Sequence, residues 1–155
     1  MGFREIAMIV VSLILVGILG LAVAPSITAS GDATKGAIVV NEIEAIVAAA
    51  NMYAVNTNQD GDITGLTAES VSKFIPNLQV NSMTARLKSK VFSNELEYMI
   101  DQWGLPDGKS AIRIYTYGAT EAYNSREHIK SFFVNKYGAS NWTDRGNDFT
   151  ILIPR

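Results

Sequence analysis

The chain has 155 residues, of which 48% are hydrophobic and 18% charged, and its formal net charge is −2. Because it holds no cysteine and a single histidine, disulfides, thiolate catalysis and a metal centre built on a His cluster are excluded. A weakly acidic chain lacks the basic field that attracts nucleic acid, so no nucleic-acid partner is expected. The length suits one anchor segment followed by one small domain.

The first predicted element is an apolar helix over residues 6–24, close to the ~20 residues that cross the hydrocarbon core of a membrane. Glu5 stands directly before it. The flanking cations Arg4 and Lys35 favour an N-terminus on the cytoplasmic side and the rest of the chain outside. A single-pass anchor fits this pattern better than a secretory signal, because such signals have a basic start and a shorter apolar centre. A signal stays an alternative because the stretch LAVAPSITAS resembles a cleavage site.

Three residues interrupt this first helix. Gly17, Gly20 and Pro25 are all unfavourable in a stable helix. A membrane helix tolerates such residues where its neighbours satisfy the freed backbone groups. A segment that leaves the bilayer and repacks in a bundle would use them for local unwinding.

Glu5 poses an electrostatic problem. A carboxylate in the hydrocarbon region costs roughly 2.5–3.5 kcal/mol on insertion scales, so it needs a cation at the same depth. Arg4 is a poor partner, because successive side chains on a helix do not face each other. The α-amine of Met1 lies about one turn back, and the amine of a staggered neighbouring copy is equally close. Pairing between copies would neutralise both charges and fix the stagger; alternatively, Arg4 and Glu5 mark the headgroup level.

A second helix is predicted over residues 33–55, with Asp32 as its N-cap. It is apolar nearly all round, which indicates burial on more than one side. If residues 1–55 form one interrupted helix, it is ~80 Å long, more than a small domain can cover. The polar exceptions are Asn41, Glu42, Glu44 and Asn51.

The loop after this helix resembles an EF-hand calcium loop in part. Oxygen-bearing side chains alternate around a glycine at Asn56, Asn58, Asp60 and Asp62. The loop starts with Asn rather than Asp, and Thr67 stands where a bidentate Glu is required. A turn rich in Asn, Asp and Gly that binds no metal is therefore favoured over a Ca²⁺ site.

The following stretch predicts a short helix, a strand, a turn and a second strand. Thr67 caps a short helix, which Ile75–Pro76 ends. Strand pieces lie at 96–103 before a turn at Leu105–Gly108, and the rest of residues 80–110 is ambiguous. Residues 111–117 alternate, with Ile112, Ile114 and Thr116 on the buried face.

The C-terminal part predicts one helix and one strand. The stretch SREHIKSFFVNKYG is a helix capped by Ser125 or Asn124 and stopped by Gly138. Residues 148–154 form the final strand, with Phe149, Ile151 and Ile153 on one face. The apolar stripe of the helix consists of Ile129, Phe132, Phe133 and Tyr137.

No motif for catalysis is found. The sequence has no nucleophile elbow, phosphate loop or carboxylate pair, so no enzyme is expected. His128 is expected on the helix surface, and Trp103 and Trp142 in the core or in subunit contacts. Asn141 begins a glycosylation sequon, which matters only in a host with the machinery.

The start of the chain resembles the mature N-terminus of a type IV pilin. That family has a hydrophobic first residue, a glutamate at the fifth position and an apolar helix, which Met1, Glu5 and residues 6–24 match. A methionine at the first position is similar to the type IVb branch, as is the stretch GDITGLTAESVSKFIPNL. Arg4 and the lack of a cysteine pair depart from the family pattern.

The resemblance implies an α+β fold: a long N-terminal helix, interrupted near Gly17–Pro25, packed on a small and mainly antiparallel sheet. Residues 1–25 would form the transmembrane and filament-core segment, 26–55 the helix packed on the head, and 56–155 the head. The implied partners are other copies of the chain, the inner membrane, the pilus assembly machinery and a prepilin peptidase that methylates Met1. No cofactor is implied other than the Ca²⁺ considered above.

The implied function is that of a major structural subunit, stored in the inner membrane with its head outside and polymerised into a helical surface filament. Such filaments serve adhesion, aggregation, motility or mating contact. A type II secretion pseudopilin is an alternative within the family. An anchored extracytoplasmic domain that binds Ca²⁺ or another ligand is an alternative from a different class.

Overall fold

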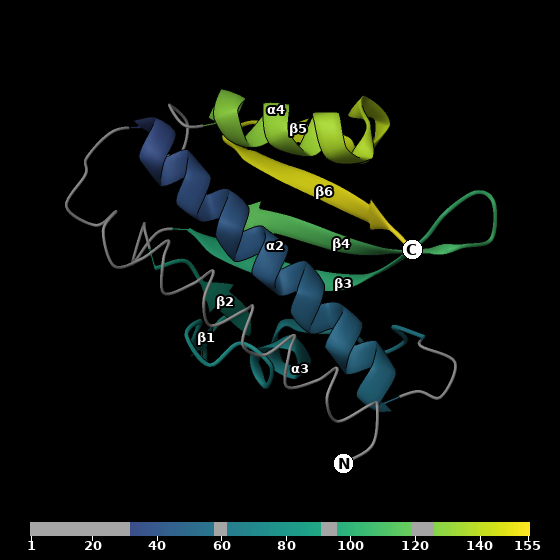
Figure 1. Cartoon of the computed structure of the whole chain (residues 1–155). Helices are drawn as coiled ribbons and strands as arrows, with labels where there is room; N and C mark the ends of the chain where they lie inside the picture. Colours follow the sequence, from purple (N-terminus) through teal and green to yellow (C-terminus); the bar gives the residue numbers. More distant parts are fainter. Residues whose placement is uncertain (1–31, 58–61, 91–95, 119–125) are drawn as a thin grey trace, which may run out of the picture.

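One long apolar helix and one antiparallel sheet make up most of the described fold (Figure 1). The computed structural model describes residues 32–57, 62–90, 96–118 and 126–155. The helix is α2 (Asp32–Thr57). The other elements are, in chain order, α3 (Ala68–Ser72), β1 (Val80–Asn81), β2 (Arg86–Lys88), β3 (Glu97–Gly104), β4 (Ser110–Tyr117), α4 (Arg126–Tyr137), a 3₁₀ turn η2 (Ala139–Asn141), β5 (Trp142–Arg145) and β6 (Asp148–Pro154).

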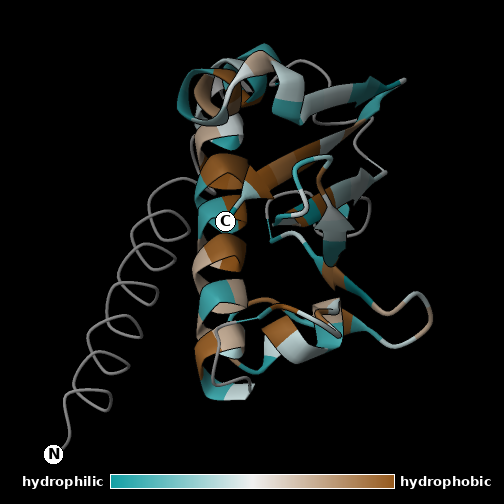
Figure 2. Ribbon diagram, turned by 90° about the vertical axis from the view of Figure 1, so that its right-hand side faces the viewer, coloured by the Kyte–Doolittle hydropathy of each residue, from teal (hydrophilic) through white to brown (hydrophobic). Residues whose placement is uncertain are grey.

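The sheet has six strands in the order β1-β2-β3-β4-β6-β5, and every pairing is antiparallel. Helix α2 crosses one face of it diagonally, and Figure 2 shows the helix and the sheet as two layers. Helix α4 contacts α2 and strands β5 and β6, while α3 contacts α2, β2 and β3. The predicted α+β class with an apolar helix on an antiparallel sheet is confirmed at this level.

The core lies between α2 and the inner face of the sheet. Side chains alternate along each strand, so the apolar positions of β3, β4 and β6 all reach the same layer. Helix α2 is buried over most of its circumference, as its apolar composition predicts. Its alanines Ala45, Ala49 and Ala50 are fully buried and let the backbone approach its neighbours closely. The largest fully buried side chains include Tyr98, Phe133, Phe149, Ile43, Ile46, Leu87 and Ile112.

Most predicted boundaries are confirmed, with small shifts. Helix α2 runs to Thr57, two residues beyond the predicted end. Thr67 caps α3 as predicted: its hydroxyl accepts from the Ser70 backbone N at 3.2 Å, and the Ser70 hydroxyl accepts from the Thr67 backbone N at 2.9 Å. The predicted turn closes with a Gly108 N–H donating to the Leu105 carbonyl at 3.0 Å.

One expectation needs correction. The predicted apolar stripe of α4 included Phe132, but that residue is 41% exposed, because only the side of α4 that carries Ile129 and Phe133 faces the core. The burial of Glu42, a polar exception on α2, was not predicted either way, and its side chain lies inside the protein at 1% exposure. Strands β1, β2 and β5 were not predicted, since they have only two, three and four residues.

The loop after α2 is tied back to the helix at one glycine. Gly65 has a φ of +81°, which a residue with a side chain adopts only at a cost. The Tyr53 hydroxyl donates to the Thr64 carbonyl at 3.0 Å, and a Cβ on Gly65 would lie 3.3 Å from that hydroxyl. Position 65 therefore requires glycine for both backbone and space.

We predict that Gly65→Ala lowers the free energy of unfolding by about 1–2 kcal/mol, the cost of placing an L-residue in the left-handed region. The measurement is urea unfolding of the full-length chain in mild detergent, followed by circular dichroism. Gly104→Ala is the matched control, because a Cβ there meets nothing within 4 Å. Equal losses in the two variants would contradict the assignment.

Candidate functional site

The residues predicted to drive assembly lie outside the described residues. Met1 and Glu5 belong to residues 1–31, and so do Gly17, Gly20 and Pro25. Their predicted roles stay predictions. The described part of the chain begins with α2.

The least buried side of α2 is a narrow stripe of six exposed or half-buried residues, five of them uncharged. Its members recur at alternating spacings of four and three, the pattern of a helix seam that packs on another helix. The one charged member, Glu44, accepts from Lys136 of α4 at 2.9 and 3.0 Å, so its charge is neutralised within the chain. The stripe consists of Ala37, Asn41, Glu44, Ala48, Asn51 and Val55.

Helix α2 also passes a test for membrane-spanning length and composition. The stretch Thr34–Thr57 reaches a mean hydropathy of 1.4, and 67% of its most apolar window is buried inside the protein. It is thus apolar enough for an anchor or a signal, and most of its surface is used for the core. The span predicted at residues 6–24 lies outside the described residues.

A shallow groove of about 320 Å³ opens beside the N-terminal part of the stripe, between α2 and α4. Its walls are mainly apolar, and the exposed ring of Phe132 forms part of the α4 side. His128 lies on the surface as predicted and borders the same groove. The lining residues are Gly36, Ala37, Val40, Asn41, His128 and Phe132.

The predicted calcium loop is described only at its two ends. Asn56 donates through its side chain to the Met52 carbonyl at 2.8 Å. Asp62 accepts from the Thr64 hydroxyl at 2.5 Å and from the Thr64 backbone N at 3.2 Å, and the first of these bonds is the main reason its pKa is lowered. Asn58 and Asp60 lie outside the described residues. Within the described residues, no group of three acidic or His side chains could hold a metal.

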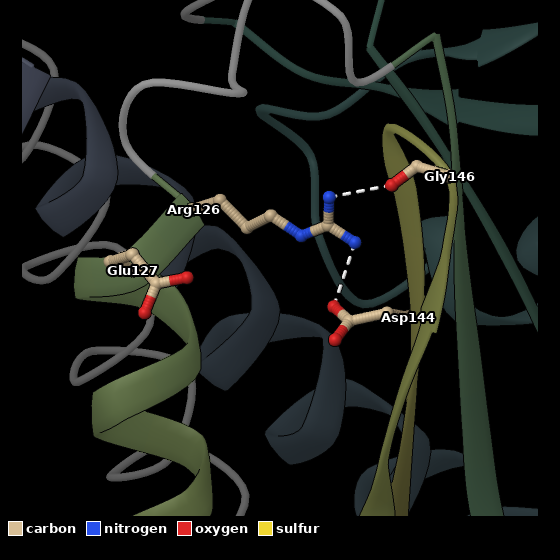
Figure 3. A pocket seen from close by; sticks show the side chains of 4 residues that line it. All are labelled: Arg126, Glu127, Asp144 and Gly146. Atoms are coloured by element: carbon tan, nitrogen blue, oxygen red, sulfur yellow. Dashed lines mark hydrogen bonds and ion pairs between the residues drawn. The ribbon is translucent and has the colours of Figure 1, made fainter.

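A second cleft, of about 310 Å³, surrounds an arginine at the start of α4 (Figure 3). Arg126 is 9% exposed and points across to the β5–β6 turn. It donates to the Gly146 carbonyl at 2.5 Å, to the Asp144 carboxylate at 2.7 Å and to the Asp148 carbonyl at 3.2 Å. Because these bonds are all made within the chain, Arg126 fastens α4 to the last hairpin.

Asp144 completes this fastening. Its carboxylate also accepts from the Trp142 indole at 2.9 Å and from Lys130 at 3.2 Å. The Trp142 hydrogen bond is the largest cause of its lowered pKa; burial, the next largest effect, raises the pKa, and the bonds from Lys130 and Arg126 lower it further. The three donors therefore stabilise the ionised form of this carboxylate.

The outer face of the sheet carries a chain of alternating cationic and aromatic side chains. Arg113 is bound to Asp101 by two hydrogen bonds, at 2.8 and 2.6 Å, and its guanidinium lies 4.0 Å from the Trp103 ring centre. Among the described residues no helix covers this face, and Trp103 is 44% exposed. The stacked contacts join β2, β3, β4 and β5: Arg86 with Tyr117, Arg145 with Tyr115 and Tyr117, and Arg113 with Tyr115 and Trp103.

Sequence reasoning missed the roles of Arg126 and Glu42. The signal for Arg126 was its position, because a cation in the first turn of a helix opposes the helix dipole and so needs a partner elsewhere. The signal for Glu42 was an acidic residue within an apolar helix. Its partners could not be found from the neighbouring sequence, because they lie far away in the chain. Comparison with protein-family models, with curated proteins and with solved structures found no match.

We predict that Arg126→Ala lowers the free energy of unfolding by about 2–3 kcal/mol, since it removes three partly buried hydrogen bonds that a charged group donates. Lys130→Ala removes only a solvent-exposed bond to the same carboxylate and should cost less than about 1 kcal/mol. Urea unfolding of both variants under identical conditions measures the difference. Losses of the same size would show that Arg126 does not fasten the helix.

Proposed function

We propose that this chain is the structural subunit of a type IV pilus-like helical filament of the type IVb kind. The observation that carries the proposal is Glu5 at the threshold of an apolar run that leads towards a second apolar helix, α2. In the proposed filament, the Glu5 carboxylate pairs with the Met1 amine of the neighbouring copy. The pair removes the cost of an isolated charge in an apolar surrounding and sets the stagger between copies.

The described fold supports this proposal in its layout. An apolar helix packed on an antiparallel sheet leaves a head with one helical side and one sheet side (Figure 2). Among the described residues, the stripe of α2 and the groove beside Phe132 are mainly uncharged surfaces on the helical side. In the filament, these surfaces face neighbouring copies.

The proposal also places the chain in the cell. Before assembly, residues 6–24 hold the subunit in the inner membrane with the head on the extracytoplasmic side, and the assembled filament is extracellular. The filament serves adhesion, aggregation, motility or mating contact.

We predict that Glu5→Ala leaves the subunit inserted in the membrane but abolishes filaments, because the carboxylate is needed only when copies pair. Electron microscopy of sheared surface material counts filaments, and membrane fractionation with an antibody to the head measures insertion. Arg4→Ala is the matched control, since it removes the neighbouring charge and should leave filaments in place. Normal filaments from Glu5→Ala, or a wild-type chain that never polymerises, would instead support an anchored monomeric domain.

A further inference from the structure

The middle of α2 carries a carboxyl group inside the protein. Glu42 is 1% exposed, and its carboxyl accepts three hydrogen bonds. The hydroxyls of Ser89 and Tyr98 donate to Oε1 at 2.7 and 3.0 Å, and the Lys90 backbone N–H donates to Oε2 at 2.9 Å. Ser89 and Tyr98 are 47 and 56 residues away in sequence, so the carboxyl joins α2 to the end of β2 and to β3.

The three donors are neutral groups. Within the described ranges, Glu42 forms no ion pair. The charge of the Lys90 ammonium lowers the pKa of Glu42 less than each of its three hydrogen bonds does. Glu44, two residues along the same helix, is by contrast exposed in part and paired with Lys136. A buried carboxylate without an ion-pair partner is costly, because hydrogen bonds from neutral groups offset only part of the lost hydration.

Both protonation states fit the same cavity. The Lys90 N–H can only donate, so the proton of the neutral acid belongs on Oε1, where it can donate to a hydroxyl oxygen of Ser89 or Tyr98. Both hydroxyls can turn and accept as well as donate. The neutral acid therefore satisfies every partner without a buried charge, whereas the ionised form keeps the hydrogen bonds and adds the charge.

We propose that Glu42 is a proton-sensitive latch: its neutral form stabilises the contact of α2 with strands β2 and β3, and its ionised form makes the same contact less stable because it adds a buried charge. The latch rests on the buried geometry alone and does not depend on filament formation. In a cell it would make the packing of the sheet on α2 weaken as the surroundings become less acidic.

The direction of the pH effect follows from linkage. Burial raises the pKa of Glu42 above its usual value, and the hydrogen bonds from Ser89, Lys90 and Tyr98 offset this only in part. The neutral form therefore contributes stability that is complete below the unfolded-state pKa and is lost as pH rises through the folded-state pKa. The lowered pKa values of Asp62 and Asp144 act in the opposite sense and in a more acidic window, so the two effects are separable.

The test uses Glu42→Gln in the full-length protein in mild detergent. The amide carbonyl accepts from the Lys90 N–H and the amide NH₂ donates to Ser89 and Tyr98, which reproduces the neutral acid at every pH. Urea unfolding between pH 5 and 8 should show wild type losing stability relative to Glu42→Gln as pH rises. Glu44→Gln is the matched control and should follow the wild-type trend.

Hydrogen exchange gives the local readout. After correction for the intrinsic pH dependence, amides of β2, Ser89–Lys90 and β3 should open several-fold more often at pH 8 than at pH 5 in wild type but not in Glu42→Gln. A tenfold change in the opening equilibrium of these amides corresponds to a Glu42 pKa that is raised by about one pH unit. Identical pH trends in wild type and Glu42→Gln would overturn the latch.

A direct titration keeps the proposal testable if the variant does not fold. Carbon-13 labelling of glutamate in wild type reports each carboxyl by infrared or magnetic resonance. The latch requires one buried glutamate that titrates above the ordinary value of 4.5. If every glutamate of the folded protein titrates at or below that value, the latch is excluded.

Discussion

The contact between α2 and the inner face of the sheet is the constraint on which the other features depend. A helix this apolar must be covered along most of its circumference. The sheet covers one side of α2. Helices α4 and α3 also contact α2, and they pack on opposite halves of the sheet. The alternation along β3, β4 and β6 supplies the matching apolar layer, and the Arg126 fastening and the Glu42 carboxyl then fix elements on that layer.

Periodicity in the sequence predicts the elements whose pattern continues for seven residues or more. Strands β4 and β6 have such patterns, and the side chains predicted to share one face of each strand are buried. Strands β1, β2 and β5 are too short for a pattern to emerge, and partners elsewhere in the sheet define them. Phe132 was misassigned because residues at helical spacing mark a possible apolar stripe without showing which part of it meets the core.

The two internal polar centres could not be predicted from local sequence. Glu42 is satisfied by groups 47 and 56 residues away, and Arg126 by residues of a hairpin that follows α4. Such long-range pairs are set by topology rather than by neighbouring residues. The converse holds for the assembly residues: Met1 and Glu5 are inferred from the sequence pattern and the family resemblance, and the described fold contributes the head that they would bring together.

The central claim is that an acid at the edge of an apolar segment pairs with the amine of the next copy. A cryo-electron microscopy map of wild-type filaments at side-chain detail tests it most directly. The account predicts that the Glu5 carboxylate of every subunit lies within about 4 Å of the Met1 amine of a neighbouring subunit. A filament whose Glu5 side chain has no neighbouring terminus within reach would contradict it.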